Sequence, residues 1–303
     1  LITNLDIFDE IEGIDNICIV KGNKLHIISE FRRLSKNNYD LGVVLARAVN
    51  QSIYLDFLNP KYKIGYLSGY NINSNFKLDT NNLGFEKENH FTSNSLNILK
   101  SMNLKYNTTF PKIKYTKKTI LESKKIFNSL NLNKEKKNIF INPYVLWETR
   151  RLDEKNYISL IVKLHKKFNF VLYGGPDGKQ LAQDIEQELL KKGIKIVNVV
   201  GKIKLKPSIC FLKYSDLFIT SDSGPMHFAI MVKVKTIAFF GPVKPQQRLP
   251  LYKNDNYVGF WYGTYAKYSS YDYESEHKDI NMQGLKAIPV SDVEKQIAKF
   301  FKL

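Results

Sequence analysis

Residues 221–227 read SDSGPMH and lie where an apolar run gives way to small and apolar residues, as at a junction between a buried strand and a helix. At such a junction Asp222 can accept hydrogen bonds from sugar hydroxyls, and Ser223 can donate its own hydroxyl. Gly224 lets a phosphate approach the backbone of a helix N-terminus, which attracts anions. His227 falls one turn into the helix, on the ligand side. The alternative is structural: Asp222 or Ser223 caps the helix, and His227 only packs.

Two other apolar runs end in glycine. Residues 172–178 (LYGGPDG) place Gly174 and Gly175 after an expected strand. Residues 239–245 (FFGPVKP) place Gly241 after another. Each run alone is typical of a tight turn, and neither has the spacing of a dinucleotide-binding fingerprint. Several such strand ends on one rim indicate a ligand that comes close to the backbone.

Two adjacent arginines, Arg150 and Arg151, follow the first strand of this region within ETRRL. In that loop they can neutralise a phosphate with paired hydrogen bonds, or they can be ordinary solvated arginines. Metal chemistry has little support, because the sequence has no H-x-x-x-H, no C-x-x-C and no D-x-D beside the junction. We therefore expect a phosphate site without a metal.

The elements that position these residues alternate regularly between residues 138 and 241. The expected strands are 138–144, 170–175, 196–201, 216–222 and 236–241, and the expected helices are 153–168, 178–193, 207–215 and 224–232. This alternation predicts an α/β, doubly wound domain with a parallel sheet covered on both faces. Ligands of such domains bind beyond the carboxyl ends of the strands, where the junction and the glycines would meet.

The first 130 residues alternate less regularly. The expected strands are 16–20, 40–46 and 63–67, and the expected helices are 51–59, 92–103 and 119–130. Residues 131–138 (NLNKEKKN) fit either a linker between two domains or a solvated loop within one. At about 100–200 residues per domain, the length of 303 residues favours two domains.

The C-terminal part holds an aromatic stretch, 243–285, that we expect to be irregular. A short helix follows Pro289, with Ser291 and Glu294 as a predicted capping box. The helix would pack onto a domain through an apolar stripe made of Val293, Ile297 and Phe301.

The chain is strongly basic, with 46 Lys and Arg against 29 Asp and Glu, a net charge of +17. Such an excess favours phosphorylated substrates or an anionic membrane surface as partners. It also fits a compositional bias toward Lys, Asn and Ile that has no function. We expect no nucleic-acid partner, because the lysines are dispersed and no recognised motif frames them.

The two cysteines, Cys18 and Cys210, stand in apolar runs, which predicts buried free thiols and a reducing compartment. No apolar stretch reaches the ~18 residues of a membrane span, and no signal peptide opens the sequence. We therefore expect a cytoplasmic protein that meets a membrane only peripherally, at the inner face of the inner membrane.

The order of these motifs resembles glycosyltransferase family 9, the ADP-heptose:lipopolysaccharide heptosyltransferases, and is most similar to heptosyltransferase II-like members. The resemblance rests on INPYVLWETRRLDEKNYISLI, FVLYGG, VVGK and LFITSDSGPMHFAIMVKVKTIAFFGP, in that order. A weaker resemblance covers NNYDLGVVLARAVNQSIYLDFLNPKYKIGY, so together they span most of the chain.

This resemblance implies a GT-B fold, in which two Rossmann-like domains face a central cleft. Residues 1–133 would be the acceptor-binding domain and 134–285 the nucleotide-sugar domain, with 286–303 a helix packing back on the N-terminal domain. The donor would be ADP-heptose, used as a substrate and without a cofactor. The acceptor would be a lipopolysaccharide core or another glycan, and we expect a monomer.

The resemblance also implies residue roles. Asp222 would contact the sugar hydroxyls, while Ser223, Gly224, Met226 and His227 would surround the diphosphate. Arg150 would match the family's basic phosphate contact, and the glycines of the strand ends would line the donor: Gly174, Gly175 and Gly241. The transfer would be inverting and would need no metal.

One departure concerns the catalytic base. The family opens with a strand and a Gly-Asp loop that resembles the source of the base, and this sequence starts after that point. The chain is then a fragment or a degenerate protein, and a fragment is favoured. The activity accordingly stays open among heptosyl transfer, transfer of another nucleotide sugar, and non-catalytic binding of a nucleotide sugar or anionic glycan.

Overall fold

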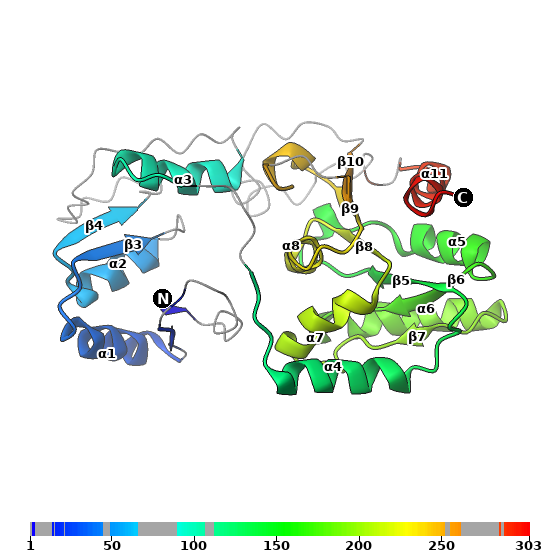
Figure 1. The fold of residues 1–303 in the computed structure, drawn as a ribbon, viewed down its shortest axis with the longest axis horizontal. Helices are drawn as coiled ribbons and strands as arrows, with labels where there is room; N and C mark the ends of the chain where they lie inside the picture. The colour runs from blue at the N-terminus through cyan, green and yellow to red at the C-terminus, as the bar shows by residue number, and fades with distance from the viewer. Residues whose placement is uncertain are drawn as a thin grey trace. The chain divides into compact units, whose positions relative to one another are not determined.

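The computed structural model describes residues 2–3, 14, 16–20, 22–44, 49–65, 90–106, 112–251, 255–261, 285 and 288–303. The chain divides into two compact units (Figure 1). The first comprises residues 1–9 and 13–109, and the second residues 10–12 and 110–303. Each unit has its own sheets and its own apolar core.

The first unit pairs short parallel strands and covers them with helices. Its strands are β1 (Ile2–Thr3) with β2 (Cys18–Ile19), and β3 (Leu41–Val44) with β4 (Tyr62–Gly65). Its helices are α1 (Lys24–Ser35), α2 (Val49–Leu58) and α3 (Phe91–Ser101). Leu34, Val44, Leu55 and Leu58 form its largest buried cluster. The predicted strands at 16–20, 40–46 and 63–67 and the predicted helices at 51–59 and 92–103 are confirmed within the described residues, of which 45–46 and 66–67 are not part. The predicted helix at 119–130 is also found, but it lies in the second unit.

The second unit is built on a six-stranded parallel sheet in the order β10-β9-β8-β5-β6-β7. The strands are β5 (Lys137–Asn142), β6 (Phe168–Leu172), β7 (Val197–Asn198), β8 (Leu217–Ser221), β9 (Thr236–Phe240) and β10 (Tyr257–Trp261). Every residue of β8 and β9 is buried, as expected for strands covered on both faces. The predicted α/β, doubly wound domain is therefore confirmed.

Helices cover both faces of this sheet (Figure 1). They are α4 (Lys117–Ser129), α5 (Glu154–Leu164), α6 (Lys179–Lys191), α7 (Leu205–Phe211), α8 (Gly224–Met231) and α11 (Val290–Phe301). Alternate strand residues face opposite layers: Ile139 and Ile141 pack with α5 and α6, whereas Phe140 packs with α7 and α8.

Two predictions for the C-terminal part are wrong. Residues 257–261 were expected to be irregular but form β10, because a parallel strand at the sheet edge needs only backbone pairing with β9. The capping box is not made: α11 begins at Val290 without a side-chain cap, and Glu294 pairs with Lys163 at 3.2 Å instead. The rest of the aromatic stretch, 262–284, lies outside the described residues.

Helix α11 packs on the second unit through its apolar stripe. Val293, Ile297 and Phe300 are buried with α5 residues, and Phe301 is partly buried beside them. Residues 131–136 connect α4 to β5 inside the same unit. The domain boundaries and the packing of the last helix on the N-terminal domain stay predictions.

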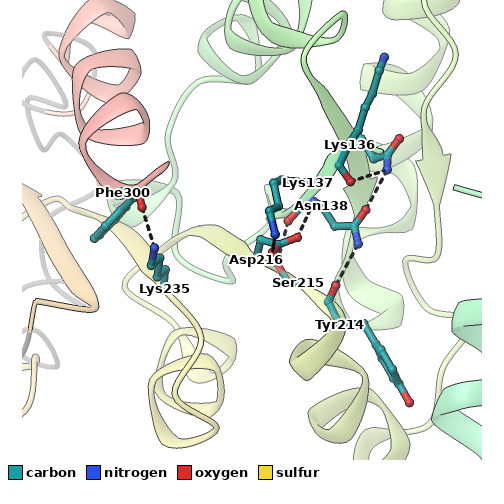
Figure 2. A network of polar contacts seen from close by, with 9 residues as sticks. Lys136, Lys137, Asn138, Tyr214, Ser215, Asp216, Lys235 and Phe300 are labelled. Carbon is teal, nitrogen blue, oxygen red and sulfur yellow. Dashed lines mark hydrogen bonds and ion pairs between the residues drawn. The ribbon is translucent and has the colours of Figure 1, made fainter. Parts of the chain in front are cut away.

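Polar groups at the amino edge of the sheet pair with one another (Figure 2). Asp216 accepts a hydrogen bond from the backbone N–H of Asn138 at 2.9 Å and forms an ion pair with Lys137 at 3.2 Å. The Nζ of Lys235 donates to the carbonyl of Phe300 at 2.6 Å. These contacts fasten the starts of β5, β8 and β9 and hold α11, so they have a structural role.

Both cysteines are free, as predicted. Cys210 is buried and its sulfur lies 3.2 Å from the Ser123 hydroxyl. Cys18 is only partly buried, so the prediction of a buried thiol holds for Cys210 but not for Cys18.

Candidate functional site

At the junction between β8 and α8, no side chain of the described residues caps the start of the helix. Ser223 is the N-cap residue of α8, yet its side chain makes no capping hydrogen bond. Its hydroxyl instead lies 3.2 Å from that of Thr220 and 3.5 Å from the amide nitrogen of Asn142. Ser223 thus has the N-cap position that the structural alternative predicts, with Pro225 in the first turn, but its side chain does not supply the capping hydrogen bond. The helix N-terminus keeps its capacity to bind an anion.

Asp222 is buried at this junction, with 3% of its surface exposed, and two arginines face its carboxylate. Arg150 Nη1 donates to Asp222 Oδ2 at 3.3 Å, and Arg248 Nε lies 3.9 Å from the same oxygen. Both arginine side chains are themselves largely buried, with 13% of Arg150 and 15% of Arg248 exposed. Two guanidinium groups and one carboxylate thus meet beside the start of α8.

A glycine allows Arg150 to reach this position. A Cβ on Gly241, directly after β9, would lie 2.1 Å from the carbonyl oxygen of Thr149. The loop after β5 therefore crosses the end of the sheet in contact with the backbone at Gly241. The 3-10 turn η2 (Glu148–Arg150) in that loop carries Arg150 to Asp222.

The end of β6 also contacts the site, through Gly174 and Asn142. Gly174 has φ +156°, and a Cβ there would lie 2.8 Å from Oδ1 of Asn142. Asn142 is itself buried and donates to Thr220 at 3.1 Å. Gly175 and Gly224, by contrast, have nothing within 4 Å of a hypothetical Cβ, so space is open at both positions.

Five side chains thus gather at the carboxyl ends of β5, β8 and β9. We call them the carboxyl-edge cluster: Asn142, Arg150, Asp222, Ser223 and Arg248. Of the predicted site residues, the structure brings Arg150, Asp222 and Ser223 together here.

Two predicted residues lie differently along α8. His227 is exposed, whereas Met226 is completely buried among Ile230, Ala238 and Phe240. The Met226 side chain thus belongs to the core beneath α8. The ligand roles of both residues stay predictions.

Three residues of the site region escaped sequence reasoning. Arg248 lies in an irregular loop eight residues after β9, and nothing in the local sequence indicates that it returns to Asp222. Asn142 and Thr220 could have been found from the sequence, since each is a polar residue near the end of an apolar strand. Buried polar groups of this kind need partners, which points to a shared polar cluster.

A buried tyrosine lies beneath the site. The Tyr157 hydroxyl on α5 is close to Ser221, and neither side-chain oxygen has a hydrogen-bond partner by geometry. Burial raises the pKa of Tyr157 strongly, and the nearby Ser221 and Arg151 offset this only in part. The phenol is therefore neutral and is no candidate for a catalytic base.

Within the described residues, no group of three or more His, Cys, Asp or Glu side chains is placed to hold a metal ion. The chemistry that the carboxyl-edge cluster supports is anion binding by arginines and backbone N–H groups, combined with hydroxyl recognition by a carboxylate.

The profile of glycosyltransferase family 9 (heptosyltransferase) matches residues 27–278. The chain belongs to glycosyltransferase family 9. Lipooligosaccharide heptosyltransferase 2 of Campylobacter jejuni is 34% identical to this family member over 134 residues, which are 44% of this chain and 42% of that protein. Lipopolysaccharide heptosyltransferase 3 of Escherichia coli K12 is 23% identical over 269 residues, 88% of this chain and 76% of that protein. The alignment with the Campylobacter relative thus spans about two fifths of its length.

Solved structures of the family share the fold. A family 9 glycosyltransferase from Veillonella parvula DSM 2008 superposes with a TM-score of 0.79 at 17% identity, covering 97% of this chain and 84% of that one. The E. coli ADP-heptose lps heptosyltransferase II gives 0.72 at 17% identity, covering 94% and 83%. The predicted GT-B fold of two Rossmann-like domains is confirmed.

Proposed function

We propose that this family 9 member transfers heptose from ADP-heptose to a lipopolysaccharide-core acceptor. The observation that carries the proposal is the buried contact of Asp222 with Arg150 and Arg248 beside the uncapped start of α8. The choice of heptose follows the family description and the relatives' names, which all specify heptosyl transfer.

The donor diphosphate would bind beside the start of α8. Arg150 and Arg248 supply two guanidinium groups, and the first turn of α8 supplies backbone N–H groups. The open space at Gly224 and Gly175 lets phosphate oxygens approach the backbone. Asp222, held between the arginines, would accept hydrogen bonds from the sugar hydroxyls.

The transfer would be inverting and would need no metal. The acceptor hydroxyl attacks the anomeric carbon as its bond to the diphosphate oxygen breaks, and ADP leaves with the electron pair. The two arginines and the α8 N-terminus stabilise the charge that grows on the leaving diphosphate. A base must take the proton of the acceptor hydroxyl, and no residue of this chain is assigned to that role.

The acceptor belongs to the proposal as well. Phosphorylated core glycans are anionic, and the net charge of +17 complements them. Among the described residues, none of the helices is long and apolar enough to cross a membrane. The cytoplasmic location and the monomeric state stay predictions.

A transfer assay tests the proposal. The gene product that contains this chain is incubated with ADP-heptose and a heptose-free core acceptor, and the acceptor mass is measured. We expect one added heptose per acceptor, and no addition with Asp222→Asn. Turnover only with another nucleotide sugar would replace the proposed donor. ADP-heptose binding without any turnover would mean a binding protein.

A further inference from the structure

The outward face of α4 combines positive charge with exposed aliphatic side chains. Residues 112–137, all of them described, contain nine lysines and two glutamates, so the lysines are not dispersed as the composition suggested. Six exposed residues define what we call the α4 face: Lys117, Lys118, Ile120, Leu121, Lys124 and Lys125. Leu121 is 66% exposed and Ile120 44%. Ile120 and Leu121 are neighbours in sequence, so they place exposed aliphatic surface among the lysines of the α4 face.

The opposite face of α4 fixes this orientation. Phe127 stacks on Tyr214 with ring centroids 4.4 Å apart and meets Phe211 edge-on at 6.3 Å. Ser123 is fully buried against Cys210 of α7. Figure 1 shows α4 along the outside of the second unit, beside α7. The helix thus presents its lysines outward on a rigid support.

The charge of the α4 face is not neutralised nearby. Glu122 is the one acid in the helix sequence, and it is partly buried. Among the described residues, the four lysines of the face take part in no ion pair, whereas Lys136 and Lys137 are occupied at the amino edge (Figure 2). Lys213 adds a further charge close by, with its Nζ 4.3 Å from the ring centre of Tyr115, just before α4.

We propose that the α4 face binds the surface of an anionic lipid bilayer. Clustered lysines are attracted to acidic headgroups, and exposed aliphatic side chains gain by entering the interface. A nucleic acid fits less well, because single strands bind by stacking on aromatic side chains and Phe127, the one aromatic residue of α4, faces inward. This surface is separate from the carboxyl-edge cluster, and the inference stands without the proposed activity.

Vesicle sedimentation tests this binding. The full chain is mixed with vesicles of phosphatidylcholine containing phosphatidylglycerol, and with pure phosphatidylcholine. We expect binding only to the anionic vesicles, lost at high salt, where the Debye length falls to about 3 Å at 1 M. Each lysine near such a surface contributes about fivefold to partitioning, so replacing all four on the α4 face with glutamine should weaken binding by roughly several hundredfold. Leu121→Gln should weaken it by about tenfold.

A matched variant controls for charge alone. Lys166, Lys167, Lys192 and Lys195 are exposed at the ends of α5 and α6, in the other helix layer, and their replacement by glutamine removes the same charge. The affinity of this control variant for the anionic vesicles should fall by less than about tenfold. Circular dichroism should match wild type in all variants, because glutamine keeps the helix propensity of lysine.

Three results would overturn the proposal. The first is no binding to anionic vesicles, and the second is an equal loss of vesicle affinity in the α4 and control variants. The third is tighter binding to a single-stranded RNA oligonucleotide than to the vesicles at the same salt, which would make the α4 face a nucleic-acid surface.

Discussion

Replacing Arg150 by methionine should destabilise the second unit by about 2–3 kcal/mol. Removing one partner of a buried ion pair typically costs 3–5 kcal/mol, because the other charge is left uncompensated. At 3.3 Å the attraction between Arg150 and Asp222 is about 5 kcal/mol for an effective dielectric constant of about 20, before desolvation is subtracted. The loss should fall below the typical range because Arg248 still faces Asp222 at 3.9 Å.

A double-mutant cycle isolates this pair. Asp222→Asn alone should lose a similar 2–3 kcal/mol or so, since it leaves two buried guanidinium groups facing a neutral amide. The free energy of unfolding of the double variant should be only slightly lower than that of either single variant. The coupling free energy between the two residues is then about 2 kcal/mol.

Urea unfolding followed by tryptophan fluorescence measures these values. Both tryptophans of the chain, Trp147 and Trp261, lie in the second unit, so the signal reports on that unit. Additive losses, with a coupling below about 0.5 kcal/mol, would refute the pairing of Arg150 with Asp222.

Three further changes test the packing around the site. Burial raises the pKa of Tyr173 from 10.0 to about 12, so the folded state keeps a proton that the unfolded state loses. This phenol should lower the free energy of unfolding by about 1.4 kcal/mol per pH unit between pH 10 and 12, and Tyr173→Phe should reduce the slope measured by urea unfolding by that amount. Tyr157, whose pKa burial also raises, keeps its own contribution to the slope. Tyr157→Phe should leave the free energy of unfolding unchanged or raise it by up to about 1 kcal/mol, and a larger loss would reveal a hydrogen bond of its hydroxyl. Gly241→Ala should lose about 2–4 kcal/mol through the clash with Thr149, while Gly224→Ala, with open space, should lose none; equal melting temperatures would contradict the close approach.

Periodicity was sufficient to predict most of the second unit. Strands such as β8 and β9 are near-continuous apolar runs, and helices such as α5 and α6 have one apolar face, so the hydrophobic pattern indicates both kinds of element. Strand β10 was missed because YVGFW follows no alternation and lies within an aromatic stretch. The predicted cap of α11 failed because Glu294 finds a partner on another helix, which local sequence cannot reveal.

The sequence predicts the position of those site residues that directly follow a strand. Asp222 and Ser223 follow a strand directly, so the topology alone places them at the carboxyl edge. Arg248 could not be placed, because its approach to Asp222 depends on the path of an irregular loop. The burial of the Met226 side chain among Ile230, Ala238 and Phe240 was not foreseen either, and its expected place beside the diphosphate stays a prediction.

The most direct test of the donor site is calorimetric titration of the chain with ADP-heptose. We expect saturable binding that free ADP competes away. Arg150→Met should weaken it by about 10- to 150-fold, the equivalent of one charge-assisted hydrogen bond of about 1.5–3 kcal/mol. The four-lysine variant of the α4 face should bind ADP-heptose as wild type does. Absence of saturable binding, or unchanged affinity in Arg150→Met, would contradict the assignment of the carboxyl-edge cluster as the donor site.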